Sequence, residues 1–193
     1  MARMGAELRR QDFVKATVKV IAEHGVANAT TRRIAAAAGC PLASLHYVFR
    51  TKDELFYAVY ESLFTLPQEA LEQVPSGATP AETAAEMLRQ VVKWLATNPD
   101  LARAQSELFF WTMRNQPETA SKIYSVGVEA VEVAIERVIG DRLNKSALRD
   151  TSRTLTLLFD GLLLGWSAHG DFDRLQTETE IACRALTLLV ENG

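Results

Sequence analysis

The chain has 193 residues, of which 48% are hydrophobic and 23% are charged, a composition typical of a globular protein with a buried core. Its apolar runs, such as LTLLFDGLLLGW, are interrupted by charge and are shorter than the roughly 20 residues that cross a bilayer, so we expect no membrane span. The first residues, MARMGAELRRQDF, contain no apolar signal segment. Together with two widely spaced cysteines, this predicts a cytoplasmic protein with reduced thiols.

The net charge of −3 is unevenly distributed along the chain. Residues 1–60 contain nine basic and five acidic side chains, a balance of +4, and the remainder of the chain carries −7. A basic N-terminal part followed by an acidic remainder suggests that an anionic partner binds the N-terminal part only.

No set of residues has the spacing of a metal, cofactor or catalytic site. Cys40 and Cys183 are far apart and form no C-x-x-C motif, and His24, His46 and His169 fall on separate predicted helices. The sequence also contains no phosphate-binding loop and no G-x-S-x-G motif. We therefore expect no catalytic residues, no metal and no cofactor, and an enzyme is the function class with the least support.

Apolar residues recur at helical spacing, and strand patterns are nearly absent, so the fold class is predicted to be all-α. Nine helices are expected: residues 7–23, 31–38, 42–49, a fourth from residue 52, 80–97, 100–114, 117–139, 146–169 and 173–191. Thr51 with Glu54 three residues later predicts a capping box at the start of the fourth helix. Pro67 predicts that this helix ends or kinks there.

Residues 31–38 and 42–49 form two short helices separated by a tight turn that contains glycine, which is the outline of a helix-turn-helix. The outline lies in the basic part of the chain. By itself it fits a plain helical hairpin equally well, because any two packed helices can produce it.

The run TTRRIAAAAGCPLASLHYVFRTKDELFYAVYE closely resembles the DNA-binding domain of the tetracycline-repressor (TetR) family. The resemblance extends from about residue 13 to residue 55, and covers the rest of the chain in helix number, helix length and the segment DGLLLGW. It implies a homodimer with a three-helix DNA-binding head at residues 1–52. It further implies that residues 53–193 bind a small effector and carry the dimer interface, which gives an N-terminal helix-turn-helix domain and a C-terminal helical domain.

The match to the family's pattern implies two groups of DNA contacts. Candidates for base contact are Arg32, Leu42, Ala43 and His46. Candidates for backbone contact are Thr31, Arg33, Ser44, Tyr47 and Lys52. Small side chains at the start of a recognition helix permit close approach to the bases, and hydroxyl and ammonium groups are ordinary phosphate donors.

Two positions depart from the family's pattern. His46 stands where a tyrosine is usual, and Val48 stands where histidine is frequent. Imidazole is a shorter donor or acceptor than a phenol, so the first departure bears on which base sequence is read. Together they favour an alternative in which the chain is a helical small-molecule-binding or interaction module that no longer reads a specific DNA sequence.

Residues 87–128 are rich in aromatic and methionine side chains, which suit an apolar effector cavity. The effector candidates are Met87, Gln90, Trp94, Phe109, Phe110, Trp111, Met113 and Tyr124, with Arg103, Glu107 and Arg114 as further polar anchors. These apolar residues could equally fill the core, and the polar ones could lie on a solvated face. Phe109 to Trp111 are consecutive, so they cannot all face one core.

The last two predicted helices carry apolar rows and two glycines four residues apart, and the family uses this helix pair as a four-helix dimer bundle. The dimer candidates are Leu155, Leu158, Gly161, Leu162, Gly165, Trp166, Ile181 and Leu188. Closely spaced glycines let helix backbones approach one another. The alternative is that these rows pack within one subunit.

These patterns together predict a DNA-binding transcription regulator. We expect a homodimeric repressor that binds a palindromic operator on double-stranded DNA and is released from it by a small, largely apolar effector. The sequence does not distinguish repression from activation, and it does not identify the effector or the operator.

Overall fold

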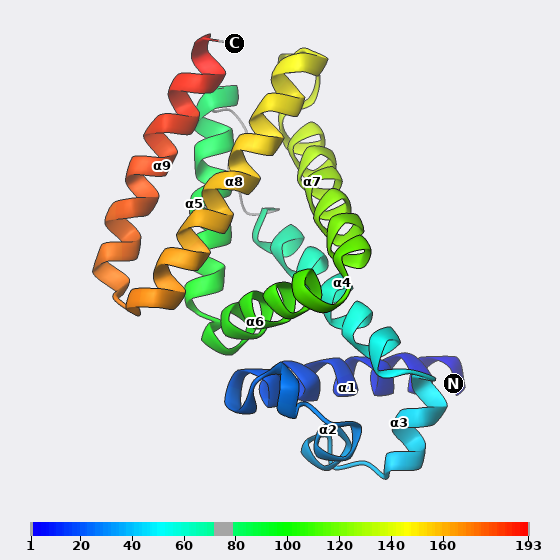
Figure 1. Ribbon diagram of the computed structural model, residues 1–193. Coiled ribbons are helices and arrows are strands. Elements are labelled where there is room, and N and C mark those ends of the chain that lie inside the picture. The colour runs from blue at the N-terminus through cyan, green and yellow to red at the C-terminus, as the bar shows by residue number, and fades with distance from the viewer. Residues whose placement is uncertain (1, 72–78, 193) are drawn as a thin grey trace. The chain divides into compact units, whose positions relative to one another are not determined.

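The structure, a computed structural model, describes residues 2–71 and 79–192. Within these ranges the chain forms nine α-helices and two short 3-10 turns and contains no strand (Figure 1). The helices are α1 (Ala2–His24), α2 (Thr31–Ala37), α3 (Leu42–Val48), α4 (Lys52–Leu71), α5 (Pro80–Ala96), α6 (Pro99–Asn115), α7 (Pro117–Ile139), α8 (Lys145–His169) and α9 (Phe172–Asn192). The turns are η1 (Val26–Asn28) and η2 (Gly140–Arg142). The all-α prediction is confirmed.

Two predicted helix boundaries were wrong, one at the end of the fourth helix and one at the start of the first. The fourth helix was expected to end or kink at Pro67, but α4 continues to Leu71, so the expected end is wrong and the kink stays a prediction. A proline inside a helix removes one hydrogen bond and its ring crowds the carbonyl four residues earlier, a cost of about 3 kcal/mol that the rest of the helix must offset. The rest of the predicted connection, residues 72–78, lies outside the described residues. Helix α1 also begins at Ala2, five residues before its predicted start.

Side-chain caps define where several helices begin. The Thr30 hydroxyl accepts a hydrogen bond from the backbone N–H of Arg33 at the start of α2. Thr79 and Glu82 form a complete capping box at the start of α5. The predicted capping of α4 is present in a modified form, because Thr51 accepts from the N–H of Glu54, whereas the Glu54 carboxylate accepts from the N–H of Arg50 at 2.8 Å. Each cap satisfies N–H groups that a helix start leaves without partners.

The chain divides into two compact units. The first contains residues 1–63 and 99–120, and the second contains residues 64–98 and 121–193. Helix α6 therefore belongs to the same unit as α1, α2 and α3. The division between DNA-binding and effector-binding functions at residues 52 and 53 is a different boundary, and it stays a prediction.

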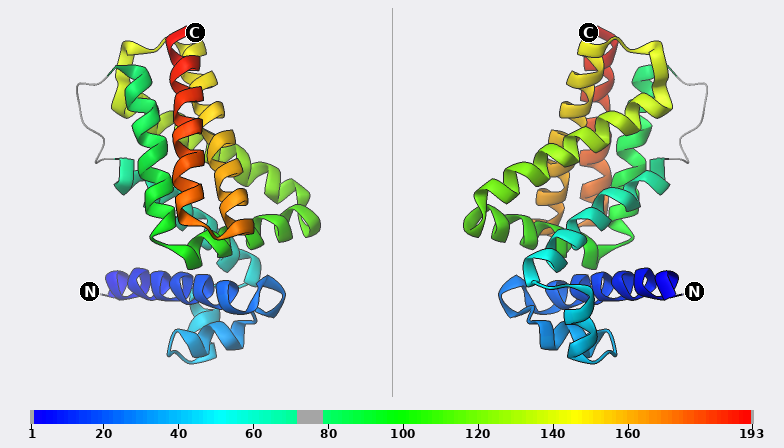
Figure 2. Two further views of the ribbon diagram at one scale, coloured as in Figure 1. Left: turned by 90° about the vertical axis from the view of Figure 1, so that its left-hand side faces the viewer. Right: turned by 90° about the vertical axis from the view of Figure 1, so that its right-hand side faces the viewer.

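The core of the first unit forms where α1, α2 and α3 meet (Figure 2). Phe13 of α1 and Phe49, directly after α3, are fully buried, and their rings meet edge to face with centroids 6.5 Å apart. Ile34 of α2 and Leu45 of α3 are buried with them. The predicted packing of Phe49 on the first helix is confirmed. Edge-to-face aromatic pairs add to the free energy gained by burying the two rings.

Helix α6 is held to the rest of the first unit by polar and aromatic contacts. The Glu107 carboxylate accepts a hydrogen bond from the backbone N–H of Val26 in η1 at 3.2 Å. Gly25 has a φ of 76°, and a Cβ added there would lie 3.2 Å from the same carboxylate. The Trp111 ring contacts the Phe56 ring edge to face, with centroids 5.6 Å apart. Two segments far apart in the sequence thus form one folded body.

A buried hydrogen bond joins α4 to α6. The hydroxyl oxygens of Tyr60 and Thr112 are 2.7 Å apart, and the Thr112 hydroxyl also donates to the carbonyl of Leu108. Because Thr112 has only one proton to donate, Tyr60 is the donor of the bond between the two hydroxyls. Burial raises the pKa of Tyr60 to about 12, so its phenol keeps that proton at neutral pH.

In the second unit, α5, α8 and α9 lie side by side, and the C-terminal half of α7 packs against them (Figure 1). The buried residues include Leu88 of α5, Ile135 of α7, Leu162 of α8 and Leu186 of α9. Arg89 of α5 binds both carboxylate oxygens of Glu180 on α9, at 2.7 and 3.1 Å. No helix in the described part of the chain is long and apolar enough to cross a membrane.

The hydrogen bond between Tyr60 and Thr112 predicts a loss of stability in Tyr60→Phe. We expect the free energy of unfolding to fall by about 1 kcal/mol, because the buried Thr112 oxygen loses its donor. Tyr57→Phe is the matched control, since Tyr57 is on the same helix and 46% exposed. Urea unfolding followed by circular dichroism measures both changes, and equal effects of the two substitutions would contradict a special role for the buried bond.

Candidate DNA-binding surface and effector residues

The turn between α2 and α3 is held by its own backbone. Gly39 has a φ of 63°, a conformation that glycine adopts without steric cost. The N–H of Cys40 donates to the carbonyl of Ala35 at 3.0 Å, and the N–H of Ser44 donates to the carbonyl of Pro41 at 2.9 Å. Pro41 caps α3 with an extended backbone, which prevents α2 and α3 from joining into one helix.

Burial divides α3 into two faces. Leu45 and the following Phe49 are each 1% exposed and point into the core of the first unit. Ala43, His46 and Tyr47 are exposed, and Tyr47 reaches 87% exposure, the highest value among the large exposed hydrophobic side chains in the described chain. Leu42 and Ser44 are half-buried at the start of the helix. The predicted DNA contacts of α3 therefore lie mainly on its outer face.

Two arginines of α2 lie in different environments. Arg32 is exposed and makes no hydrogen bond or ion pair with any residue that the structure describes. The Arg33 guanidinium donates to the backbone carbonyl of Asn28 at 3.1 Å. Arg33 is thus held against the protein, whereas Arg32 is available to bind an external group. Thr31 is half-buried beside them.

Lys52 lies at the start of α4 with its ammonium 4.7 Å from the centroid of the Phe56 ring. Partial burial lowers its pKa, and the neighbouring charge of Asp53 opposes that change. The ring contact orients the side chain through the attraction between a cation and an aromatic face. Arg32, Tyr47 and Lys52 thus all belong to the first unit, and each carries a group able to bind phosphate or base atoms.

Comparison with known proteins identifies the family. Residues 13–59 match the model of the bacterial regulatory proteins of the tetR family, and this segment includes α2, α3 and their turn. The chain belongs to the TetR family. It is a DNA-binding transcription regulator of a family that is not enzymatic.

Relatives of this TetR-family chain extend the likeness over most of its length. It is 26% identical over 163 residues to the HTH-type nicotine-responsive transcriptional repressor HdnoR of Paenarthrobacter nicotinovorans, covering 83% of this chain and 84% of the relative. It is 26% identical over 178 residues to the HTH-type transcriptional repressor Rv1474c of Mycobacterium tuberculosis, covering 86% and 87% of the two chains. A TetR transcription regulator from Haloarcula marismortui has the same fold, with a TM-score of 0.74, 22% identity, and coverage of 96% and 98%.

The effector candidates fall into two groups, one in each compact unit. Phe109, Phe110, Trp111 and Met113 are in the first unit, on α6. Phe110 and Met113 are exposed, whereas Trp111 is half-buried against Phe56. The expectation that the three consecutive aromatics cannot share one core agrees with these different environments. Arg103 and Glu107 do not form a separate polar site, because they bind backbone groups near the end of α1.

The remaining effector candidates, Met87, Gln90, Trp94 and Tyr124, are in the second unit. Met87 is completely buried within the core cluster, and the Gln90 side chain donates to the Glu86 carboxylate at 2.7 Å. Both are therefore already engaged by the chain itself. Tyr124 on α7 is 38% exposed.

Asp160 on α8 is a candidate that the sequence reading did not select. The sequence does show it as the one charge within LTLLFDGLLLGW, and that pattern is the signal that could have found it. Its side chain is half-buried, and burial raises its pKa from an ordinary value of 3.8 to about 6. Perturbed carboxylates of this kind are common at functional sites.

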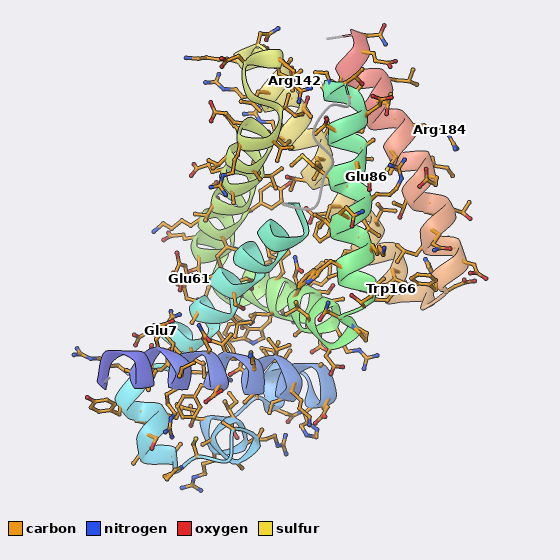
Figure 3. All side chains as sticks on the ribbon, turned by 180° about the vertical axis from the view of Figure 1, so that it is seen from behind. Glu7, Glu61, Glu86, Arg142, Trp166 and Arg184 are labelled. Carbon is orange, nitrogen blue, oxygen red and sulfur yellow. The ribbon has the colours of Figure 1, made fainter. Side chains whose placement is uncertain are left out.

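The dimer candidates also fall into two groups. Leu155 and Leu162 are buried in the core of the second unit, and Leu158 and Trp166 pack against that core. Trp166 lies near the C-terminal end of α8 (Figure 3). These four agree with the alternative that the row packs within one subunit. Ile181 and Leu188 of α9 are exposed, as are Gly161 of α8 and the leucines at 157 and 164; Gly165 is half-buried. Helix α8 thus has two apolar rows, and an interface would use the outer one.

Burial of Asp160 predicts a pH-dependent gain of stability in Asp160→Asn. Because the folded-state pKa is raised, the folded chain binds a proton more tightly than the unfolded chain, so stability falls as the pH rises from about 4 through about 6. The penalty is then fully present above pH 6. Asparagine removes it, and after allowance for solvent screening we expect a gain of about 1 kcal/mol at pH 7.5.

The gain in Asp160→Asn should shrink as the pH is lowered toward 4.5, because the wild-type carboxyl becomes protonated there. Denaturant unfolding at several pH values measures it. Asp150→Asn, an exposed position on the same helix, is the control and should change stability by less than about 0.5 kcal/mol. A variant less stable than the wild type at pH 7.5 would show that Asp160 has a stabilising partner.

Proposed function

We propose that this TetR-family chain is a cytoplasmic, ligand-responsive repressor. It binds a palindromic operator as a homodimer and leaves it when a small, largely apolar effector binds. The observation that carries the proposal is the division of α3 into a buried face and an exposed face. The exposed face offers small and polar side chains at the spacing that a helix needs in the major groove.

The polar side chains suit different parts of DNA. Arg32 has no described partner and an exposed guanidinium, which can bind two acceptors on one guanine edge. Tyr47 projects a phenol from the exposed face, at a reach that suits a phosphate oxygen. His46, beside it, is the candidate for a base edge and the position at which this chain departs from the family's pattern.

A palindromic operator requires two copies of α3, the proposed recognition helix, at a defined spacing, which is roughly 34 Å for one turn of DNA. The outer row of α8 and the exposed row of α9 supply a surface for that pairing. Ile181, Leu188 and the exposed leucines at 157 and 164 leave apolar area in contact with water in a single chain. Covering it with a second copy recovers the free energy of that exposure.

Release by an effector requires that the effector bind the two states of the dimer with different affinity. DNA must then weaken effector binding by the same factor. The relative HdnoR is described as nicotine-responsive, which supports a small organic effector for this chain. We infer that α6 transmits the effect of effector binding to α3. Helix α6 carries four of the effector candidates and is folded into the same unit as α3.

The main alternative is a helical module that binds a small molecule without reading a specific DNA sequence. The departures at His46 and Val48 favour it. The two functions differ in one measurable ratio, which is the affinity for the operator divided by the affinity for unrelated DNA of the same length.

Electrophoretic mobility shift with the DNA segment upstream of the gene tests the operator proposal. We expect specific binding at moderate salt, and we expect Arg32→Ala to cost about 1–3 kcal/mol on that segment and much less on unrelated DNA. Tyr47→Phe should weaken binding to the upstream segment and to unrelated DNA by a similar factor, since a phosphate contact does not depend on the base sequence. Arg137→Ala, an exposed arginine of α7, is the control. Equal affinity for both DNAs would favour the alternative.

The interface proposal predicts a monomer in Ile181→Asp. A carboxylate at the centre of an apolar interface cannot be buried there without a partner, so the dimer dissociates while the fold stays intact. Sedimentation velocity gives the oligomeric state and circular dichroism the helix content. Val133→Asp, which alters an equally exposed valine of α7, should leave a dimer. A dimer that survives Ile181→Asp would place the interface elsewhere.

A further inference from the structure

The ring of Phe56 on α4 contacts a cation and a second aromatic ring at the same time. The ammonium of Lys52, one turn earlier on α4, is 4.7 Å from the centroid of the Phe56 ring. The Trp111 ring of α6 meets it edge to face, with centroids 5.6 Å apart and ring planes at 89°. Phe56 is 3% exposed, so the surrounding core and these two contacts leave its ring little freedom to move.

The charge of Lys52 has no carboxylate partner, unlike that of another cation that lies over an aromatic ring in the first unit. The Arg10 guanidinium is 5.6 Å from the centroid of the Phe49 ring, and it also binds the Glu61 carboxylate at 2.8 Å. Lys52 forms no hydrogen bond and no ion pair with any residue that the structure describes. The ring therefore holds the Lys52 ammonium in place while its N–H donors stay unused.

The position of Lys52 in its helix favours an external anion. Lys52 is the first residue of α4, where the N–H groups of the helix start disfavour a cation. Partial burial lowers the pKa of its ammonium, and the neighbouring charge of Asp53 opposes that change. A phosphate beside the ammonium offsets both the helix dipole and the burial.

Contact with the ring prepares the ammonium for such a phosphate. Lysine has a long flexible stem, so fixing its ammonium beside a phosphate has a high entropy cost. Attraction to the Phe56 ring removes part of that freedom before DNA binds. An ammonium has three N–H donors, and its attraction to one ring face leaves donors for phosphate oxygens.

We propose that Phe56 positions Lys52 for contact with a DNA phosphate, and that Trp111 of α6 fixes the Phe56 ring in that role. Phe56 and Trp111 are positioning residues, since they act on DNA through the Lys52 ammonium. This inference rests on the proposed function, because it takes Lys52 to be a phosphate contact of the DNA-binding surface.

The three side chains link α6 to DNA within one compact unit. Edge-to-face contacts depend on the position of both rings, so a displacement of Trp111 changes the position of the Phe56 ring. The change reaches a phosphate contact, which does not depend on base sequence. Displacing Trp111 should therefore weaken binding to every duplex by a similar factor, whereas a change at Arg32 should act mainly on the operator.

A fluorinated phenylalanine at residue 56 tests the link with little change in the shape of the core. Three fluorine atoms withdraw electron density from the ring face, so trifluorophenylalanine attracts a cation more weakly than phenylalanine does. Fluorescence anisotropy at low salt measures the affinity for a labelled duplex of unrelated sequence. We expect this affinity to fall about two- to fivefold in the otherwise wild-type chain, and to stay unchanged in the Lys52→Gln background.

Trp111→Leu extends the same test to α6. It should weaken binding to the unrelated duplex by about twofold, and the effect should disappear in the Lys52→Gln background. Trifluorophenylalanine in place of Phe172, an exposed phenylalanine of α9, is the control for the fluorinated residue. Lys122→Gln, which alters an exposed lysine of α7, is the control for the loss of one positive charge. Both controls should bind the duplex nearly as the wild type does.

Three results would overturn the proposal. An affinity that falls equally with and without Lys52 would show that Phe56 acts on the fold and not on the ammonium. An affinity that does not change on fluorination would show that the ring does not hold the ammonium for DNA. A Lys52→Gln variant that binds as tightly as the wild type would show that Lys52 does not contact DNA.

The outcome is separable from the test of the operator, because the duplex has an unrelated sequence. If the link is found but operator and unrelated DNA bind equally well, the link stands and sequence-specific repression fails. If the operator is bound specifically and fluorination has no effect, the repressor stands and the link fails. A wild-type chain that binds no DNA would contradict the proposed function itself.

Discussion

The edge-to-face packing of Phe13 on Phe49 is the contact on which the candidate DNA-binding surface of α3 depends. Phe49 follows α3 directly, so burying its ring fixes the end of that helix, and Leu45 one turn earlier fixes its rotation. With these two side chains inside, Ala43, His46 and Tyr47 must point outward. A helix of seven residues is too short to be stable alone, and it is therefore the core that determines which side chains can meet a base pair.

The same logic applies to α6, which is held by contacts with residues much earlier in the sequence. Glu107 binds the N–H of Val26, Thr112 binds Tyr60, and Trp111 packs on Phe56. Hydrogen bonds and ring contacts of this kind have narrow geometry, so a displacement of α6 must either carry η1 and α4 along with it or break them. Within the second unit, the ion pair of Arg89 and Glu180 joins α5 to α9 in the same way.

The sequence predicted the helices and the helix-turn-helix well, because both depend on local patterns. Periodic apolar residues, Gly39 and the family's motif are all visible within short windows. It did not predict the continuation of α4 past Pro67, because the outcome depends on the sum of the flanking helical bonds. It also did not separate the two apolar rows of α8. Leucines at 155 and 157 look alike in a sequence, and only the packing of α5 and α9 decides which one is buried.

Asp160 shows the same limit, since a charge within an apolar run is visible in the sequence but the burial that raises its pKa is not. Gly25 shows what one absent atom contributes. Its positive φ ends α1, and the space that a Cβ would occupy lies against the Glu107 carboxylate. A side chain at this position would strain the left-handed backbone and displace the carboxylate of Glu107 by a few tenths of an ångström. That shift would weaken the hydrogen bond from the Val26 N–H, which is one of the links between α6 and the end of α1.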